Sequence, residues 1–139
     1  MKAEIDDMDW RIIKILKQDS RKTNVAIAND LRASEGTVRQ RIARLRHDGV
    51  ITRFTIDIAS KGLKAIIEVN IEVNVHATRI AKKIGSLSGV EKVFEISGES
   101  DILAIVDVSN TTDLNETIEA IRAMPDVKST KTRLILGEQ

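Results

Sequence analysis

Two side chains that can form paired hydrogen bonds are neighbours between Ser34 and Leu45. Arg39 carries a planar guanidinium with five donors, and Gln40 carries an amide that both donates and accepts. An arginine can bond both acceptors of a guanine, a glutamine can bond an adenine, and a threonine methyl, as at Thr37, fits the methyl of thymine. These residue types are therefore typical of a surface that reads base edges in the major groove of DNA.

The residues around this group predict two short helices joined by a tight turn. Ser34 is a good N-cap because its hydroxyl can accept from free amides of the first helical turn. Val38, Ile42 and Leu45 recur at helical spacing and predict one buried stripe. In a helix-turn-helix the N-terminal residues of the second helix reach the bases. We therefore predict a recognition helix beginning at Glu35. The candidate DNA-binding residues are Ser34, Gly36, Thr37, Arg39, Gln40, Arg41 and Arg44.

Charge is distributed unevenly along the chain. Residues 1–58 carry a net charge of +3 and residues 59–139 a net charge of −2, so the basic half is the half with the turn motif. A concentrated positive field is what a phosphate backbone attracts. We assign Arg41, Arg44 and Arg46 to phosphates or to the rim of the interface. The alternative is a solvated basic helix, with Arg41 lying along its flank.

Composition narrows the remaining possibilities. The 139 residues suit one domain, or two small ones. The absence of cysteine excludes disulfides, thiolate metal sites and a thiol nucleophile, and we expect no metal and no cofactor. We identify no signal peptide and no apolar run of about 20 residues, so we expect a cytoplasmic protein that does not interact with membranes. Abundant isoleucine and a single proline favour a thermophilic source.

The first half of the chain is predicted to hold the helix-turn-helix domain, residues 1–51, followed by a strand and linker over residues 52–62. Within it, Trp10 is expected to cover the edge of the small helical core. Val50 to Ile58 alternates apolar and polar residues and predicts a strand, which would serve as a wing against DNA or as a hinge.

The second half, residues 63–139, alternates between strand and helix patterns. Its predicted strands are 63–75, 90–97, 102–108 and 127–136, and its predicted helices are 77–87 and a segment capped by Asn110. This β-α-β-β-α-β order predicts a ferredoxin-like sandwich, which makes the whole chain α+β. Two helices cover only one face of such a sheet. We therefore expect a homodimer in which the other face packs against a second copy.

Three stretches occur in a set order along the chain. Residues 5–13 open the first helix, residues 34–51 form the recognition helix and its exit, and residues 98–101 form a G-x-x-D turn. Together they resemble the Lrp/AsnC family of transcription regulators, also called feast/famine regulatory proteins, over essentially the whole chain. Two positions depart from the family pattern. Arg32 replaces the usual glycine of the turn, so either it tolerates an unusual backbone or the turn differs slightly. Gln40 replaces a frequent arginine.

The resemblance implies a homodimer, often assembled further into tetramers or octamers, that binds pseudo-palindromic double-stranded DNA and senses an amino-acid effector. Asp101 would accept from the ammonium group of the effector, and amides and hydroxyls would donate to its carboxylate. The candidate effector-binding residues are Gly98, Glu99, Ser100, Asp101, Thr130 and Thr132. The alternative is that the turn is an ordinary hairpin with Asp101 as its cap. Acidic residues near the turn, Glu68, Glu72, Glu95 and Glu99, favour a basic effector such as lysine.

Two other classes of function were weighed. An enzyme would need a convergent acid, base or nucleophile set, and the two histidines, His47 and His76, lie in different domains, so we expect no enzymatic activity. An architectural DNA-binding protein with little sequence specificity is the closer alternative. Its affinity would come almost wholly from phosphates and would survive scrambling of the site.

Overall fold

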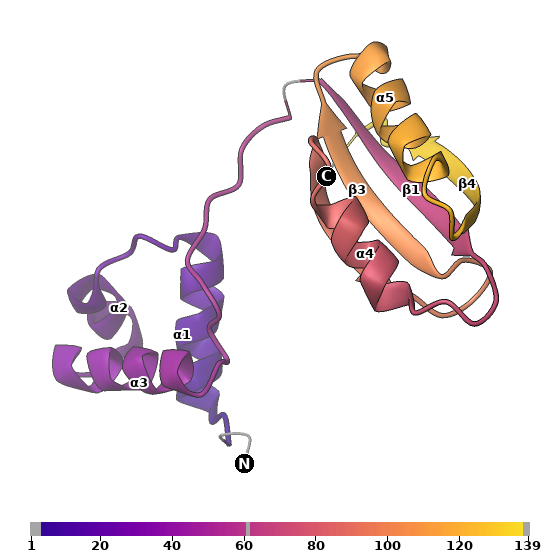
Figure 1. Ribbon diagram of the computed structural model, residues 1–139. Coiled ribbons are helices and arrows are strands. Elements are labelled where there is room, and N and C mark those ends of the chain that lie inside the picture. The colour runs from indigo at the N-terminus through magenta and orange to yellow at the C-terminus, as the bar shows by residue number, and fades with distance from the viewer. Residues whose placement is uncertain (1–3, 61, 138–139) are drawn as a thin grey trace. The chain divides into compact units, whose positions relative to one another are not determined.

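The computed structural model describes residues 4–60 and 62–137 and divides into two compact units, each with its own core. The first, Met1–Ile58, is called the helical unit, and the second, Ala59–Gln139, the sheet unit. In the described residues the helical unit has three helices, and the sheet unit has four strands and two helices. Figure 1 shows the two units as ribbons. No helix in the described part of the chain is both long and apolar enough to cross a membrane.

The helical unit consists of α1 (Asp7–Gln18), α2 (Asn24–Leu31) and α3 (Glu35–His47). Each helix begins at a residue whose side chain accepts from an amide of the first turn: Asp6, Thr23 and Ser34. At α1 the bond is reciprocal, because the Asp9 carboxylate also accepts from the Asp6 amide at 3.2 Å. These local bonds explain why the helices start where the sequence predicted.

The core of the helical unit forms where the apolar stripes of the three helices meet. It contains Ile12, Leu16, Ile27, Ala28, Leu31 and Val38. Trp10 is not part of it: its side chain is largely exposed, so the prediction that it covers the core edge was wrong. Trp10 lies two residues before the buried Ile12, on another side of α1, since successive helical residues are about 100° apart.

The turn between α2 and α3 has the unusual backbone that the sequence predicted. Arg32 adopts the left-handed conformation, with φ 53° and ψ 45°. A residue with a Cβ in this region costs about 1–2 kcal/mol relative to the right-handed helix. The Ala33 amide, donating to the Ala28 carbonyl at 2.9 Å, closes the end of α2. The turn therefore keeps its shape without glycine.

The strand predicted between Val50 and Ile58 is absent, which corrects the expectation of a strand in residues 52–62. Residues 52–60 have no strand assignment. Alternation favours a strand only where a second strand supplies backbone partners, and none lies beside this segment among the described residues. The segment leaves Ile56 73% exposed and is tied to the α1–α2 connection by Ser20 Oγ, which donates to the Thr55 carbonyl at 3.1 Å.

The sheet unit has the β-α-β-β-α-β order predicted from the sequence. Its elements are β1 (Leu63–Ile71), α4 (Ala77–Gly85), β2 (Val90–Glu95), β3 (Ile102–Val108), α5 (Thr111–Arg122) and β4 (Val127–Leu134). Neighbouring strands are antiparallel in the order β2-β3-β1-β4, which confirms the ferredoxin-like sandwich and the α+β class. β1 is shorter than predicted: its pairing with β4 shifts between Asn70 and Ile71, and Val73 beyond it is 83% exposed.

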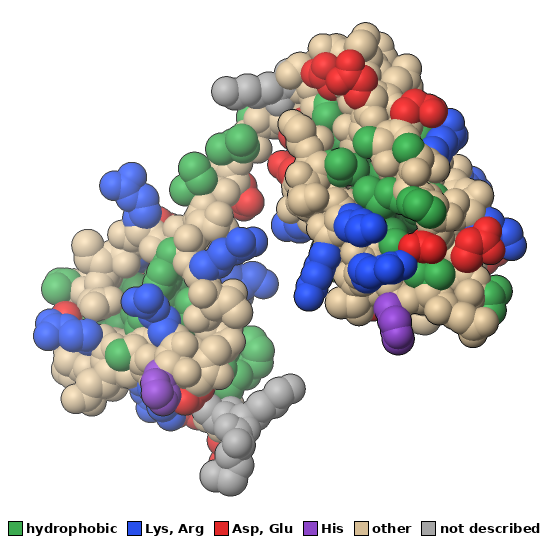
Figure 2. All heavy atoms as spheres, in the orientation of Figure 1, with side chains coloured by type: hydrophobic (Ala, Val, Ile, Leu, Met, Phe, Trp, Pro, Cys, Tyr) green, Lys and Arg blue, Asp and Glu red, His purple; other side chains and the backbone are tan. Residues whose placement is uncertain are grey.

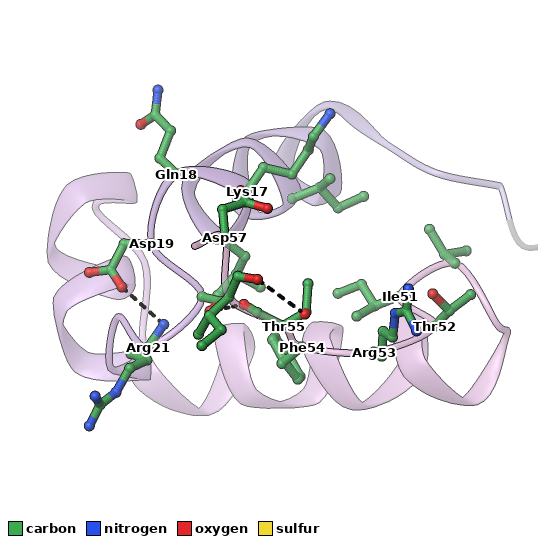
Figure 3. A pocket seen from close by; sticks show the side chains of 15 residues that line it. Lys17, Gln18, Asp19, Arg21, Ile51, Thr52, Arg53, Phe54, Thr55 and Asp57 are labelled. Carbon is green, nitrogen blue, oxygen red and sulfur yellow. Dashed lines mark hydrogen bonds between the residues drawn. The ribbon is translucent and has the colours of Figure 1, made fainter. Parts of the chain in front are cut away.

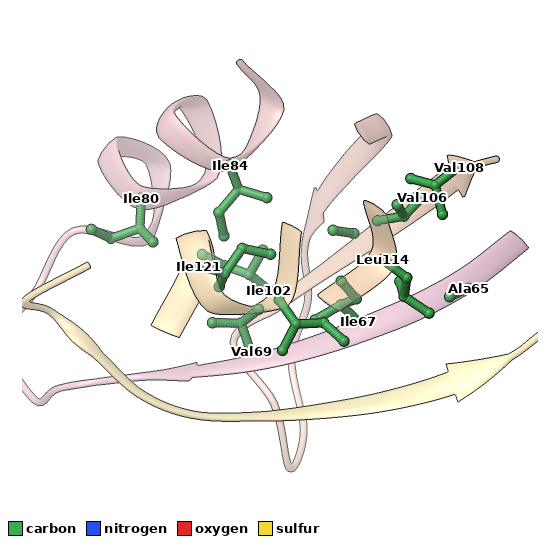
Figure 4. Packing of buried hydrophobic residues seen from close by; sticks show 12 residues of the cluster. Ala65, Ile67, Val69, Ile80, Ile84, Ile102, Val106, Val108, Leu114 and Ile121 are labelled. Atoms are coloured by element: carbon green, nitrogen blue, oxygen red, sulfur yellow. The ribbon is translucent and has the colours of Figure 1, made fainter. Parts of the chain in front are cut away.

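Both helices pack on one face of this sheet, as Figure 4 shows. Ile80 and Ile84 of α4, with Leu114 and Ile121 of α5, lie against the buried side chains of β1 and β3. Those side chains are Ala65, Ile67, Val69, Ile102, Ala104, Val106 and Val108. The alternate residues of the same strands lie on the face without helices, which we call the open face.

Candidate nucleic-acid interface and effector site

Helix α3 is anchored by one side and exposed on the other. Val38 and Leu45 are fully buried. At 100° per residue, Gly36 and Gln40 lie on the side opposite to them, and both are exposed. Figure 2 shows Lys and Arg side chains projecting from the face of the helical unit that it presents. A helix fixed in this way can offer one face to a groove without losing its core contacts.

The hydroxyls at the start of α3 bond to one another. Thr37 donates its amide to Ser34 Oγ at 3.1 Å, and the two hydroxyl oxygens are 2.7 Å apart. Ser34 is exposed and Thr37 half-buried. Gly36 between them has open space where a Cβ would be, so its backbone is accessible. The first turn of α3 therefore presents accessible backbone and small polar groups.

Arg39 forms an ion pair with Glu35 one turn earlier. Its Nε lies 3.0 Å and its Nη2 2.5 Å from Glu35 Oε1, and this hydrogen bond raises the pKa of Arg39. The Arg39 side chain is nevertheless 67% exposed. An exposed pair of this spacing contributes only about 0.3–0.5 kcal/mol. A base or phosphate can therefore replace Glu35 as the partner of Arg39.

Arg41 and Arg44 lie in a charged cluster between α3 and α1. Arg41 Nη1 donates to Asp6 Oδ2 at 2.6 Å and to Asp9 Oδ1 at 2.9 Å, and Arg44 Nη2 donates to the second oxygen of Asp9. Asp9 is fully buried, whereas the two arginine side chains are 26% and 44% exposed. A buried carboxylate is destabilising unless it is paired, so the two arginines keep Asp9 satisfied.

The hydrogen bond from Arg41 lowers the pKa of Asp6, and the Asp9 amide lowers it further. The same carboxylates raise the pKa of Arg41, with Asp6 the larger cause. Sequence reasoning assigned Asp9 only to the cap of α1 and missed this cluster. The available signals were the Asp-x-x-Asp spacing of residues 6–9 and the two arginines one turn apart in the recognition helix.

Arg46, assigned from the sequence to a phosphate or to the rim of the interface, lies against the extended segment. Its guanidinium carbon is 5.8 Å from the centroid of the Phe54 ring, within cation–π range. The same segment borders a groove of about 640 Å³ beside the end of α1, which Figure 3 shows. The polar groups there bond locally, as where the Arg21 amide donates to Asp19 Oδ1 at 3.0 Å.

In the sheet unit, the G-x-x-D turn connects β2 to β3. Gly98 has φ +130°, a conformation that favours glycine. The Asp101 amide donates to the Val69 carbonyl at 3.1 Å, and Asp101 Oδ2 accepts from the Ile71 amide at 2.9 Å. The amides of residues 98–100 donate to no group among the described residues. The turn therefore holds a carboxylate beside three free donors.

Thr130 and Thr132 do not join this turn within one chain. They pair with Val69 and Ile67, whose side chains are buried under the helices, so the threonines lie on the helix face. Thr130 Oγ1 accepts from Arg122 Nε of α5 at 2.9 Å. Asp101 lies just before β3, and its carboxylate bonds instead to the backbone amide at the end of β1.

Asn70 is a polar residue of the sheet unit that sequence reasoning missed. Its Oδ1 is buried and has no hydrogen-bond partner among the described residues. Asn70 lies between Val69 and Ile71, the two residues whose backbones bond to Asp101. An unpaired acceptor beside a carboxylate is suited to an ammonium group. Its position in an apparently regular alternating strand gave no signal.

Both units match known protein families. Residues 5–52 match the winged helix-turn-helix DNA-binding model, and residues 64–138 match the Lrp/AsnC ligand binding domain, which covers more than half of the chain. The chain belongs to the Lrp/AsnC family. This Lrp/AsnC protein is a transcriptional regulator with a DNA-binding helix-turn-helix and a ligand-binding domain.

Individual proteins agree with this assignment. The HTH-type transcriptional regulator LysM of Saccharolobus solfataricus is 39% identical over 96% of this chain and 95% of its own length. A Mycobacterium tuberculosis feast or famine regulatory protein, solved in complex with L-methionine, is 22% identical and shares the fold with a TM-score of 0.87, over 97% of this chain and 94% of that one. The homocitrate synthase of Sulfolobus acidocaldarius is 45% identical over 55% of this chain but only 16% of that enzyme, so its activity does not transfer.

Proposed function

We propose that this Lrp/AsnC regulator recognises a specific DNA site through α3 and that a small amino acid, bound at the G-x-x-D turn, modulates its activity. The observation that carries the DNA part is the arrangement of α3. Val38 and Leu45 anchor the helix, and Gly36, Arg39 and Gln40 are exposed. The side that faces away from the core carries a guanidinium, an amide and an accessible backbone, which are groups that read base edges.

Within α3 we assign roles by position. Thr37, Arg39 and Gln40 read bases, because they lie in the N-terminal half of the helix. Ser34 and Gly36 let the backbone approach a phosphate at the positive end of the helix. Arg41 and Arg44 contact phosphates when bound DNA displaces part of their bonding to Asp6 and Asp9.

The open face supports assembly with a second copy. Ile66 of β1 lies opposite Ile105 of β3, and Leu103 lies opposite Phe94 of β2, so apolar residues of three strands adjoin there. Beside them Arg133 bonds to Glu68 at 3.2 Å. Packing two such faces together would bury the apolar row and place two α3 helices on half-sites about one helical turn, or 34 Å, apart. Larger assemblies, tetramers or octamers, would build on this dimer.

The same turn supports an amino-acid effector. Free amides at residues 98–100 can donate to a carboxylate, and Asp101 with Asn70 Oδ1 can accept from an ammonium. The side chains of Glu72, Glu95 and Glu99 are exposed and make no ion pair among the described residues, which favours a basic amino acid such as lysine. Thr130 and Thr132 remain predicted donors, although within one chain they lie on the face of the sheet that the helices cover.

The test separates this proposal from an architectural role. The native chain is used to select duplexes of about 30 base pairs from a random pool, and its affinity for a selected duplex is compared with that for a scrambled one at one salt concentration. A specific regulator prefers the selected duplex by about 1,000-fold or more. Equal affinity for both duplexes would establish the architectural alternative. A thermal-shift series with the twenty amino acids tests the effector, since a ligand of the folded state raises the Tm.

A further inference from the structure

The cluster that links α1 to α3 is electrically neutral and contains two of the proposed phosphate contacts. Asp6 and Asp9 contribute two negative charges, and Arg41 and Arg44 contribute two positive ones. The bonds span 32 to 35 residues of sequence, so they form only in the folded unit. A carboxylate bonded to a guanidinium occupies the same donors that a phosphate would use.

The two arginines are held unequally. Arg41 bonds to both carboxylates through Nη1 and is 26% exposed, whereas Arg44 bonds to Asp9 alone and is 44% exposed. Asp9 itself has no access to solvent. Removing both arginines from it would leave a buried charge unpaired, which is strongly unfavourable. In the absence of DNA, Arg41 and Arg44 are therefore held by Asp9 and are not freely available to other polyanions.

We propose that Asp9, supported by Asp6, is a specificity-determining residue: its buried carboxylate competes with DNA phosphates for Arg41 and Arg44 and thereby suppresses binding to unrelated sequence. Phosphate contacts carry no sequence information but supply essentially all of non-specific affinity. Discrimination between partners often depends on an element that weakens the wrong complex. Here that element is a carboxylate inside the protein, and base readout by the N-terminal half of α3 then decides which DNA is bound.

This inference rests on the proposed DNA-reading role of α3 and deepens it. The DNA-reading role of α3 and the role of Asp9 can nevertheless fail separately. If the native chain binds selected and scrambled duplexes equally, the proposed specificity fails. The role of Asp9 is measured on the scrambled duplex alone, through the dependence of affinity on salt.

The main variant is Asp9→Asn, which removes the charge and keeps an oxygen for the Asp6 amide. Its matched control is Asp7→Asn, because Asp7 is exposed on the same first turn and makes no ion pair among the described residues. Affinities for the selected and the scrambled duplex are measured by fluorescence anisotropy over a series of KCl concentrations. Circular dichroism checks that each variant is folded.

Asp9→Asn is expected to steepen the slope of log Kd against log salt on the scrambled duplex by about 0.9 for each arginine that gains a phosphate. Its affinity for the scrambled duplex at moderate salt should rise about tenfold, and that for the selected duplex by less, so the preference falls. In a chain that carries Arg41→Gln and Arg44→Gln, adding Asp9→Asn should leave the slope unchanged. A merely structural role for Asp9 would weaken binding and leave the slope as it was.

Equal slopes for Asp9→Asn and Asp7→Asn would overturn the proposal. If Asp9→Asn does not fold, Arg44→Gln in the otherwise native chain decides. If Asp9 holds Arg44, the native Arg44 makes little phosphate contact. Arg44→Gln should then change the slope of log Kd against log salt on the scrambled duplex by well under 0.9, the value of roughly one full phosphate contact. A change of the full size would show that Arg44 is freely available to DNA, and the proposal would be wrong.

Discussion

Asp101 Oδ2 accepts a hydrogen bond of 2.9 Å from the amide of Ile71, thirty residues earlier in the chain. The bond lies where β1 ends, at the irregularity in its pairing with β4 between Asn70 and Ile71. The carboxylate of the G-x-x-D turn therefore satisfies an amide at the end of a neighbouring strand. One of its oxygens is structural, and its charge and second oxygen remain for an ammonium group.

Asp101→Asn should abolish the stabilisation of the chain by its amino-acid effector while leaving DNA binding intact. The amide oxygen can still accept from Ile71, so the unliganded Tm should change by only a few degrees, but the charge that attracts an ammonium is lost. Thermal-shift titration with the effector found for the native chain measures this. Glu116→Gln, on the exposed side of α5, is the matched loss of one charge. An unchanged titration curve in Asp101→Asn would exclude the role.

Arg39→Ala should relax base preference at one position of each half-site. Losing a bidentate contact costs about 1–3 kcal/mol of discrimination against the wrong base. The measurement is the affinity for the selected duplex and for its single-base variants. Arg11→Ala serves as control, since Arg11 is an exposed arginine of α1 outside the proposed interface. Equal weakening on every duplex would identify Arg39 as a phosphate contact instead.

The link between α1 and α3 should weaken in acid. The hydrogen bond from Arg41 lowers the pKa of Asp6 below its ordinary value of 3.8. A carboxyl whose pKa is lowered in the folded state stabilises the fold when the pH is above its ordinary pKa. This stabilisation is lost as the pH falls through the folded-state pKa. Asp6→Asn should therefore be less stable than the native chain above about pH 4, and the difference should shrink below it.

Denaturant unfolding at several pH values, followed by the fluorescence of Trp10, measures this difference. Trp10 is the single tryptophan and lies on α1, so its signal reports the helical unit. Taking the difference between the free energies of unfolding of the native chain and of Asp6→Asn at each pH removes the contribution of the titrating groups that both proteins contain. A difference that does not vary with pH would mean that the charge of Asp6 does not contribute.

Leu103→Glu should convert the proposed dimer into a folded monomer. Leu103 lies on the open face opposite Glu68 and Phe94, so a new carboxylate there would be buried only if two sheets packed together. Sedimentation at several concentrations measures the mass. Val73→Glu, at a highly exposed position after β1, should leave the mass unchanged. A native chain that sediments as a monomer would exclude sheet-on-sheet assembly.

The elements that local chemistry determines could be predicted from the sequence. Ser34 and Asn110 cap helices as expected, because a cap depends on residues three positions away. The left-handed Arg32 followed from its place in the turn motif. The β-α-β-β-α-β order of the sheet unit likewise followed from local strand and helix patterns.

Features that depend on distant parts of the chain were missed. The alternating residues 50–58 resemble a strand, but a strand requires a partner that one chain does not supply. Arg41 and Arg44 look like free cations until α1 places Asp9 between them. Within one chain, the pairing register places Thr130 opposite the buried Val69, on the face that the helices cover. In each case the deciding contact joins residues far apart in sequence.

Each unit has its own core, and no residue of the described part of the chain belongs to both cores. Mutations that alter one interior leave the packing of the other untouched. A new DNA specificity and a new effector preference can therefore be acquired independently. The chain is therefore suited to chimaeras in which the sheet unit of one regulator is joined to the helix-turn-helix of another.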